Sequence, residues 1–106
     1  MVEQKKSMDI PSDEIGRFCR KWGVSELSLF GSVLGQDFRQ DSDVDVLVTF
    51  ESDSKHGLFD MVRMQDELEG IFGRKVDLVS RQGVESSTNY IRRRNILDSA
   101  MVIYAA

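Results

Sequence analysis

The sequence is poor in cysteine, in long apolar runs and in excess positive charge, and each shortage excludes a class of protein. Cys19 is the only cysteine among the 106 residues, so an internal disulfide is impossible and we expect the reducing cytoplasm. No run approaches the ~20 apolar residues of a membrane span. Residues 1–9 also lack the apolar core of a secretion signal. We therefore expect no contact with a membrane.

The charge balance bears on nucleic-acid binding. The formal net charge is -4 at pH 7, whereas proteins that wrap a nucleic-acid backbone neutralise its phosphates with Lys and Arg. Direct binding of nucleic acid is therefore not expected. Binding of a single nucleotide together with magnesium is less affected by the acidic charge of the chain.

The length and composition predict one soluble domain. Hydrophobic residues make up 41% and charged residues 30% of the 106 residues, enough for a modest core and too few for a second domain. Residues 1–10 show no periodicity and are predicted to be a disordered N-terminal tail. Residues 11–106 are predicted to be the domain.

The apolar spacing predicts a chain of mixed α and β structure. Ile15, Phe18, Cys19 and Trp22 fall at helical spacing after Ser12, which can cap a helix. The full set of predicted helices covers residues 12–22, 58–72 and a closing turn from 96, with a short helix around 33–34. The predicted strands cover residues 24–30, 44–50, 74–80 and 101–104. This places the chain in the α/β (α+β) class.

Residues 27–50 contain a pair of carboxylates that needs a counter-charge. Asp43 and Asp45 are two apart next to an apolar strand, so they project to one face. Two unit charges ~4 Å apart repel by roughly 4 kcal/mol at an effective dielectric of about 20. A hard divalent cation with oxygen ligands offsets this repulsion. The spacing therefore predicts a magnesium site.

Gly31 and Ser32 lie between the two strands and suit a phosphate. Glycine lets the backbone come close to a ligand, and serine adds a hydroxyl and an N–H donor. A helix that begins at Ser32 would also point its positive end at an anion. We interpret the stretch as a site for a nucleoside triphosphate between this turn and metal ions on the paired aspartates.

Gly31-Ser32, followed after ten residues by Asp43-Val44-Asp45, resembles the signature of the DNA polymerase β nucleotidyltransferase superfamily. At this chain length it is similar to the minimal nucleotidyltransferase (MNT) family. The resemblance implies a nucleotidyltransferase fold, with a small mixed sheet packed against helices. It also implies the antitoxin half of a pair whose toxin is a helical HEPN-domain protein.

The resemblance further implies roles for individual residues. Asp43, Asp45 and Asp77 would be the catalytic carboxylates and would hold two Mg²⁺ ions, with Asp77 as general base. Gly31 and Ser32 would bind the phosphates of ATP, and AMP would pass to a hydroxyl of the toxin. The sequence itself makes Asp77 unusual, because an isolated Asp is disfavoured inside a strand. A charge that protects an edge strand from aggregation is the structural alternative.

One departure from the family leaves a second function open. Many relatives carry an arginine shortly after Gly-Ser, where this chain has Val33, Leu34, Gly35 and Gln36. Arg39 is the candidate to replace that phosphate contact. The alternative function is a non-catalytic antitoxin that neutralises its toxin by forming a complex. A polymerase or tRNA-modifying enzyme uses the same motif, but it normally needs a further domain.

Other polar residues have no assigned role. Arg92, Arg93 and Arg94 are consecutive and cannot share one helix face, so some meet solvent and the rest meet phosphates or an acidic partner. His56 is predicted to be a solvated loop residue, since transfer by metal and carboxylates needs no imidazole. A homodimer also stays open.

Overall fold

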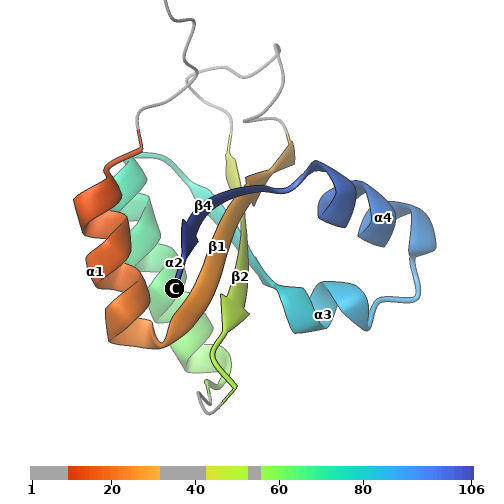
Figure 1. Ribbon diagram of the computed structural model, residues 1–106, viewed down its shortest axis with the longest axis horizontal. Coiled ribbons are helices and arrows are strands. Elements are labelled where there is room, and N and C mark those ends of the chain that lie inside the picture. Colours follow the sequence, from red (N-terminus) through yellow and green to blue (C-terminus); the bar gives the residue numbers. More distant parts are fainter. Residues whose placement is uncertain (1–9, 32–42, 53–55) are drawn as a thin grey trace, which may run out of the picture.

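Strands from both ends of the chain share one sheet in the computed structural model, which describes residues 10–31, 43–52 and 56–106 (Figure 1). The strands are β1 (Val24–Phe30), β2 (Val44–Phe50), β3 (Val76–Ser80) and β4 (Met101–Ala105), in the order β3-β2-β1-β4. β1 pairs antiparallel with β2 and β4, whereas β2 and β3 are parallel. The sheet is mixed, as predicted.

Two long helices cover one face of this sheet. Figure 1 shows α1 (Ser12–Trp22) and α2 (Leu58–Phe72) together on one side of the strands. Alternation along β2 turns Val44, Val46 and Val48 toward these helices, and all three are fully buried. The predicted stripe of α1 also enters this cluster through Ile15, Phe18 and Cys19. The main core therefore forms where the apolar spacing predicted it.

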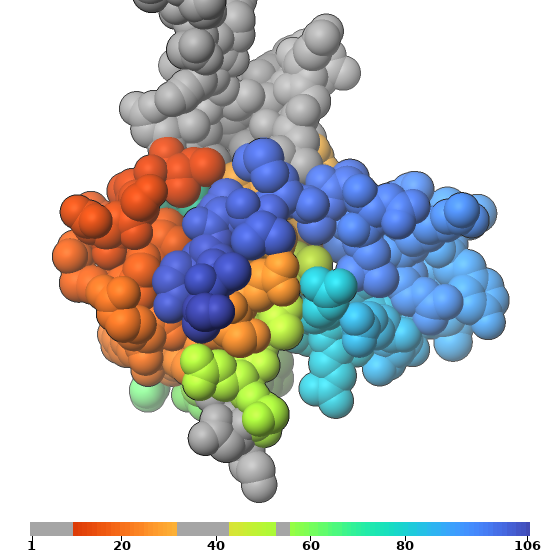
Figure 2. All heavy atoms as spheres, in the orientation of Figure 1, coloured from red at the N-terminus to blue at the C-terminus, as the bar shows by residue number. Residues whose placement is uncertain are grey.

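The opposite face carries a smaller cluster under two short helices. α3 (Arg81–Glu85) and α4 (Tyr90–Ser99) follow β3 and form a lobe that projects from the sheet (Figures 1 and 2). Phe30 and Leu47 from the sheet pack there with Val84 and Ile96 from the helices. Asp45 lies between Val44 and Val46 and so faces this side. The carboxylates thus share a face with a cluster much smaller than the main core.

Several predicted bounds and contacts are wrong at the level of single residues. β3 begins at Val76 instead of Arg74. α1 has Pro11 at its N-cap without a side-chain bond, so Ser12 does not cap it. α2 buries Met64 and Leu68, whereas its apolar residues Leu58 and Val62 are 78% and 52% exposed.

His56 also differs from the prediction, because it is held by neighbouring groups instead of being solvated. Its ring lies 4.6 Å from the ring of Phe50 and 5.8 Å from that of Trp22, centroid to centroid. Its Nε2 is 2.6 Å from the Trp22 carbonyl oxygen. Trp22 ends α1 and Phe50 ends β2, so their contacts with His56 depend on the tertiary fold and are not visible in the local sequence.

None of the helices within residues 10–31, 43–52 and 56–106 is long and apolar enough to cross a membrane.

Candidate functional site

The end of β1 brings the backbone of Gly31 against the side chain of Asp45. Phe30 is the register partner of Asp45 in the antiparallel pair of β1 and β2. Gly31 follows it at φ +79°, a conformation that favours glycine. A Cβ atom at Gly31 would collide with Oδ2 of Asp45 and lie 3.1 Å from its Cγ. Gly31 therefore lies directly against the Asp45 carboxylate, and the approach of its backbone to a phosphate stays a prediction.

The parallel pairing of β2 and β3 sets Asp77 beside Asp45. The two residues are register partners, between the pairs Val44–Val76 and Val46–Leu78. The Val44 N–H donates to the Lys75 carbonyl oxygen at 2.8 Å at the start of this ladder. Register partners in neighbouring strands, ~4.8 Å apart, point their side chains to the same face. Asp45 and Asp77 therefore share one face, and Asp77 is exposed there.

Asp43 lies just before β2 and is exposed. Within the described part of the chain, no three side chains of Asp, Glu, His or Cys are grouped closely enough to hold a metal ion. The structure therefore brings Asp45 and Asp77 together but does not gather Asp43 with them as one cluster of ligands. Ser32 and Arg39, the other predicted site residues, lie outside the described residues.

A cavity of about 580 Å³ opens beside Gly31 and Asp45, within the range of about 300–1,000 Å³ usual for ligand sites. Phe30, Gly31 and Asp45 line it from the sheet. The opposite wall belongs to α4 and the residue before it, and it consists of Asn89, Ile91, Arg92, Asn95, Ile96 and Ser99. The face with the carboxylates therefore has room for a small molecule.

The wall formed by α4 was missed by the sequence prediction, which placed only a closing turn from residue 96. The helix begins at Tyr90, and the side-chain oxygen of Asn89 accepts from the Arg92 N–H at 3.0 Å. An asparagine three residues before this N–H is a helix-start signal. That signal could have revealed the helix and, with it, the polar residues that line the cavity.

Comparison with known proteins places this geometry in a family context. A family model described as a nucleotidyltransferase domain matches residues 15–102. The protein adenylyltransferase MntA of Thermococcus cleftensis is 36% identical over 66 residues, 62% of this chain and 65% of that protein. The chain thus spans just under two thirds of the length of this curated relative.

Solved structures give the same fold. One described as a minimal nucleotidyltransferase is 33% identical, covers 85% of this chain and 86% of its own, and has a TM-score of 0.64. Another similar chain belongs to a complex of a tri-AMPylated HEPN toxin from Shewanella oneidensis with an MNT antitoxin. It has a TM-score of 0.61 at 16% identity and covers 90% of this chain and 70% of its own. At that identity the likeness concerns the fold alone.

Proposed function

Because the chain belongs to the nucleotidyltransferase domain family, we propose that it transfers AMP from ATP to a hydroxyl group of a HEPN-domain toxin. Membership confirms the resemblance drawn from the spacing of Gly31-Ser32 and Asp43-Val44-Asp45. The observation that carries the proposal is the register of Asp45 with Asp77, beside the turn at Gly31. The name of the curated relative, a protein adenylyltransferase, supports a protein as acceptor.

Magnesium suits the donor atoms at this site. Asp43, Asp45 and Asp77 offer only carboxylate oxygens, which are the ligands that this hard cation prefers. The side-by-side placement of Asp45 and Asp77 supports this assignment, and Asp43 lies two residues before Asp45. Magnesium at such a site neutralises charge on the triphosphate and on the leaving pyrophosphate. We assign two ions to these three side chains.

The residues of the chain would hold the reactants and move one proton. The backbone at Gly31 and Ser32 donates hydrogen bonds to the triphosphate, and Arg39 remains a predicted phosphate contact. The acceptor hydroxyl attacks the α-phosphorus, a new O–P bond forms, and the bond from that phosphorus to the bridging oxygen breaks. The proton passes to the Asp77 carboxylate, whose exposure keeps it open to an incoming partner. Pyrophosphate leaves.

The proposed compartment follows from the reactants and the thiol. ATP and a protein acceptor meet in the cytoplasm, where reducing conditions suit a chain whose Cys19 is a free, buried thiol.

A second function, neutralisation by binding alone, is kept open by the residues that follow Gly31-Ser32. The chain has Val33, Leu34, Gly35 and Gln36 where many relatives carry an arginine. In this alternative the chain occludes the toxin, and the carboxylates take no part. Titration of the chain into its toxin separates the two functions, because occlusion predicts toxin neutralisation that is unchanged when magnesium and ATP are removed.

The test of the proposed function is transfer of label from ATP labelled at the α-phosphate to the protein encoded by the neighbouring gene, which the proposal expects to be a HEPN-domain toxin. We expect Asp45→Asn and Asp77→Asn each to lower the rate by about a hundredfold or more, as losses of charge-stabilising groups do. Asp98→Asn is the matched control, because Asp98 is a 72% exposed carboxylate on α4 that pairs with Arg94. Absence of transfer by the native chain, or equal rates in all variants, would overturn the proposal.

A further inference from the structure

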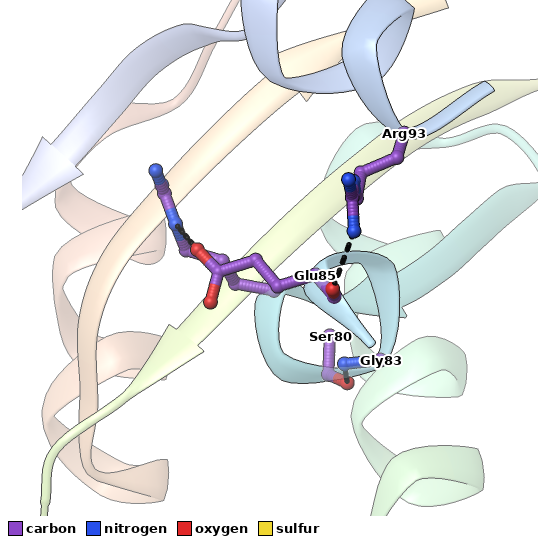
Figure 3. Close-up of polar contacts among 5 residues, drawn as sticks. Ser80, Gly83, Glu85 and Arg93 are labelled. Atoms are coloured by element: carbon purple, nitrogen blue, oxygen red, sulfur yellow. Dashed lines mark hydrogen bonds and ion pairs between the residues drawn. The ribbon is translucent and has the colours of Figure 1, made fainter. Parts of the chain in front are cut away.

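The three consecutive arginines of α4 have different surroundings, and only one of them lines the cavity at Asp45. Arg93 fastens α4 to α3. Its guanidinium donates to the Glu85 carbonyl oxygen at 3.1 Å, as Figure 3 shows, and lies 4.8 Å from the centre of the Tyr90 ring. At the start of α3, the Oγ of Ser80 caps the helix by accepting from the Gly83 N–H at 3.0 Å. Arg93 thus has a structural task.

Arg94 points its charge along the exposed side of the same helix. Its Nε is 3.6 Å from Oδ2 of Asp98, four residues on, and the side chain of Arg94 is 83% exposed. Such exposed pairs contribute about 0.3–0.5 kcal/mol. Arg94 does not line the cavity.

Arg92 is the arginine without a structural task. Across the described residues, no hydrogen bond or ion pair engages its guanidinium, although its backbone N–H takes part in the Asn89 cap. It lines the 580 Å³ cavity together with Gly31 and Asp45, and it also borders a smaller cavity of about 290 Å³ beneath α3. Of the described residues that line the larger cavity, Arg92 is the cationic one.

We propose that Arg92 binds the triphosphate of the nucleotide from the side opposite Gly31, an assignment that rests on the proposed function. A triphosphate bound beside Asp45 would bring its negative charge next to a carboxylate. A cationic side chain would offset part of this repulsion, in addition to the metal ions. A guanidinium forms paired hydrogen bonds with phosphate oxygens, and a side chain free of other partners gives up no existing bond to do so.

The neighbours of Arg92 along the helix support a nucleotide at this wall. Asn95 and Ser99 follow at spacings of three and four residues, so they lie on the same side of α4 and also line the cavity. The Asn95 amide can donate and accept hydrogen bonds to sugar or base, and the Ser99 hydroxyl, which donates to the Asn95 carbonyl oxygen at 2.7 Å, can accept one. Polar residues of α4 therefore line the cavity opposite Asp45.

Calorimetric titration with magnesium and an ATP analogue whose α–β bridge cannot be cleaved tests the assignment without turnover. We expect Arg92→Ala to weaken binding by about tenfold or more, equivalent to about 1.4 kcal/mol. Adenosine has no phosphate for Arg92 to bind, so Arg92→Ala and the native chain should bind it with affinities within about twofold of each other. A twofold difference is small beside the loss of a charge-assisted hydrogen bond. Arg92→Lys should recover part of the loss, since it restores charge without the paired geometry.

Arg94→Ala is the matched control, because it removes the same charge from the same helix away from the cavity. It should bind the analogue as the native chain does. Equal binding by Arg92→Ala and the native chain would overturn the assignment and leave the proposed function standing. The same holds if Arg92→Ala raises only the KM for the acceptor protein, since Arg92 would then serve the partner. A native chain that binds no analogue would overturn both.

Discussion

Replacing Gly31 by alanine should have two effects that can be measured separately: backbone strain at its positive φ, and displacement of the Asp45 side chain that lies against it. The residue has φ +79°, where a side chain costs about 1–2 kcal/mol in a left-handed conformation. The new Cβ would also meet the Asp45 side chain, lying 3.1 Å from Cγ and 3.4 Å from Cβ and colliding with Oδ2. Because that oxygen is the end of a side chain that can rotate, we expect Asp45 to turn away from the turn at Gly31.

Gly73 supplies a control with the same backbone demand and no neighbour. It ends α2 at φ +70°, and a Cβ there would have nothing within 4 Å. Both alanine variants should therefore lose about 1–2 kcal/mol of stability. At about 4–8 °C per kcal/mol for a domain of this size, thermal unfolding can resolve that loss.

The two variants should differ in activity instead. A displacement of about 1 Å in a catalytic group can lower a rate by about a hundredfold. We expect a loss of that size in AMP transfer for Gly31→Ala and a native rate for Gly73→Ala, both measured on folded protein well below the midpoint of unfolding. The reasoning is refuted if Gly31→Ala transfers AMP at the native rate, or if Gly73→Ala loses as much.

Further predictions concern the core. Phe18 is buried, so Phe18→Ala should lower the free energy of unfolding, measured in urea, by about 3–5 kcal/mol. Phe59 is 82% exposed, so Phe59→Ala should change that free energy by about 0.5 kcal/mol or less. Similar losses for both variants would contradict the core assignment. Burial raises the pKa of the Cys19 thiol from 9.0 to about 12. As the pH rises, the unfolded chain therefore releases this proton before the folded chain does. The free energy of unfolding should then fall above pH 9 by at most about 1.4 kcal/mol per pH unit, and it should fall less steeply in Cys19→Ala. Parallel plots of this free energy against pH for the two chains would refute the prediction.

Periodic apolar residues were enough to predict the elements of the main core. The bounds of α1, β1, β2 and α2 agree with the predicted ranges, because each element buries residues at its own regular spacing against the others. The predictions failed for elements that are stabilised by a cap or by a single tertiary contact and not by a periodic apolar stripe. α3 has five residues, and its N-cap bond to Ser80 and contact through Val84 hold it, neither of which forms a periodic pattern.

The same limit explains why α4 was missed. Its apolar residues, Ile91, Ile96 and Leu97, do not form a regular stripe, and Ile91 is 76% exposed. Packing of Ile96 against the sheet and the Asn89 cap define the helix. Because α4 forms a wall of the cavity, a prediction without this helix could not say which of the three consecutive arginines lines it.

The candidate site was predictable in part. A spacing of two residues placed Asp43 and Asp45 toward one face, and the turn at Gly31 suggested a close backbone approach. The pairing of Asp77 with Asp45 depends on the parallel register of β2 and β3, which are joined by a whole helix. No local pattern records that register, so Asp77 entered through the family resemblance.

The position of β4 has a consequence for how the molecule is made. β4 pairs with β1, so residues 101–105 complete a ladder begun by residues 24–30, and the Ala106 N–H donates to the Ser25 carbonyl oxygen at 2.8 Å. Pairings so distant in sequence form slowly, because a long loop must close first. During synthesis α4 emerges before β4, so the cavity wall can be anchored at both its ends only after β4 has emerged and paired with β1. The cavity beside Asp45 should therefore form later in synthesis than the pairing of β1 with β2.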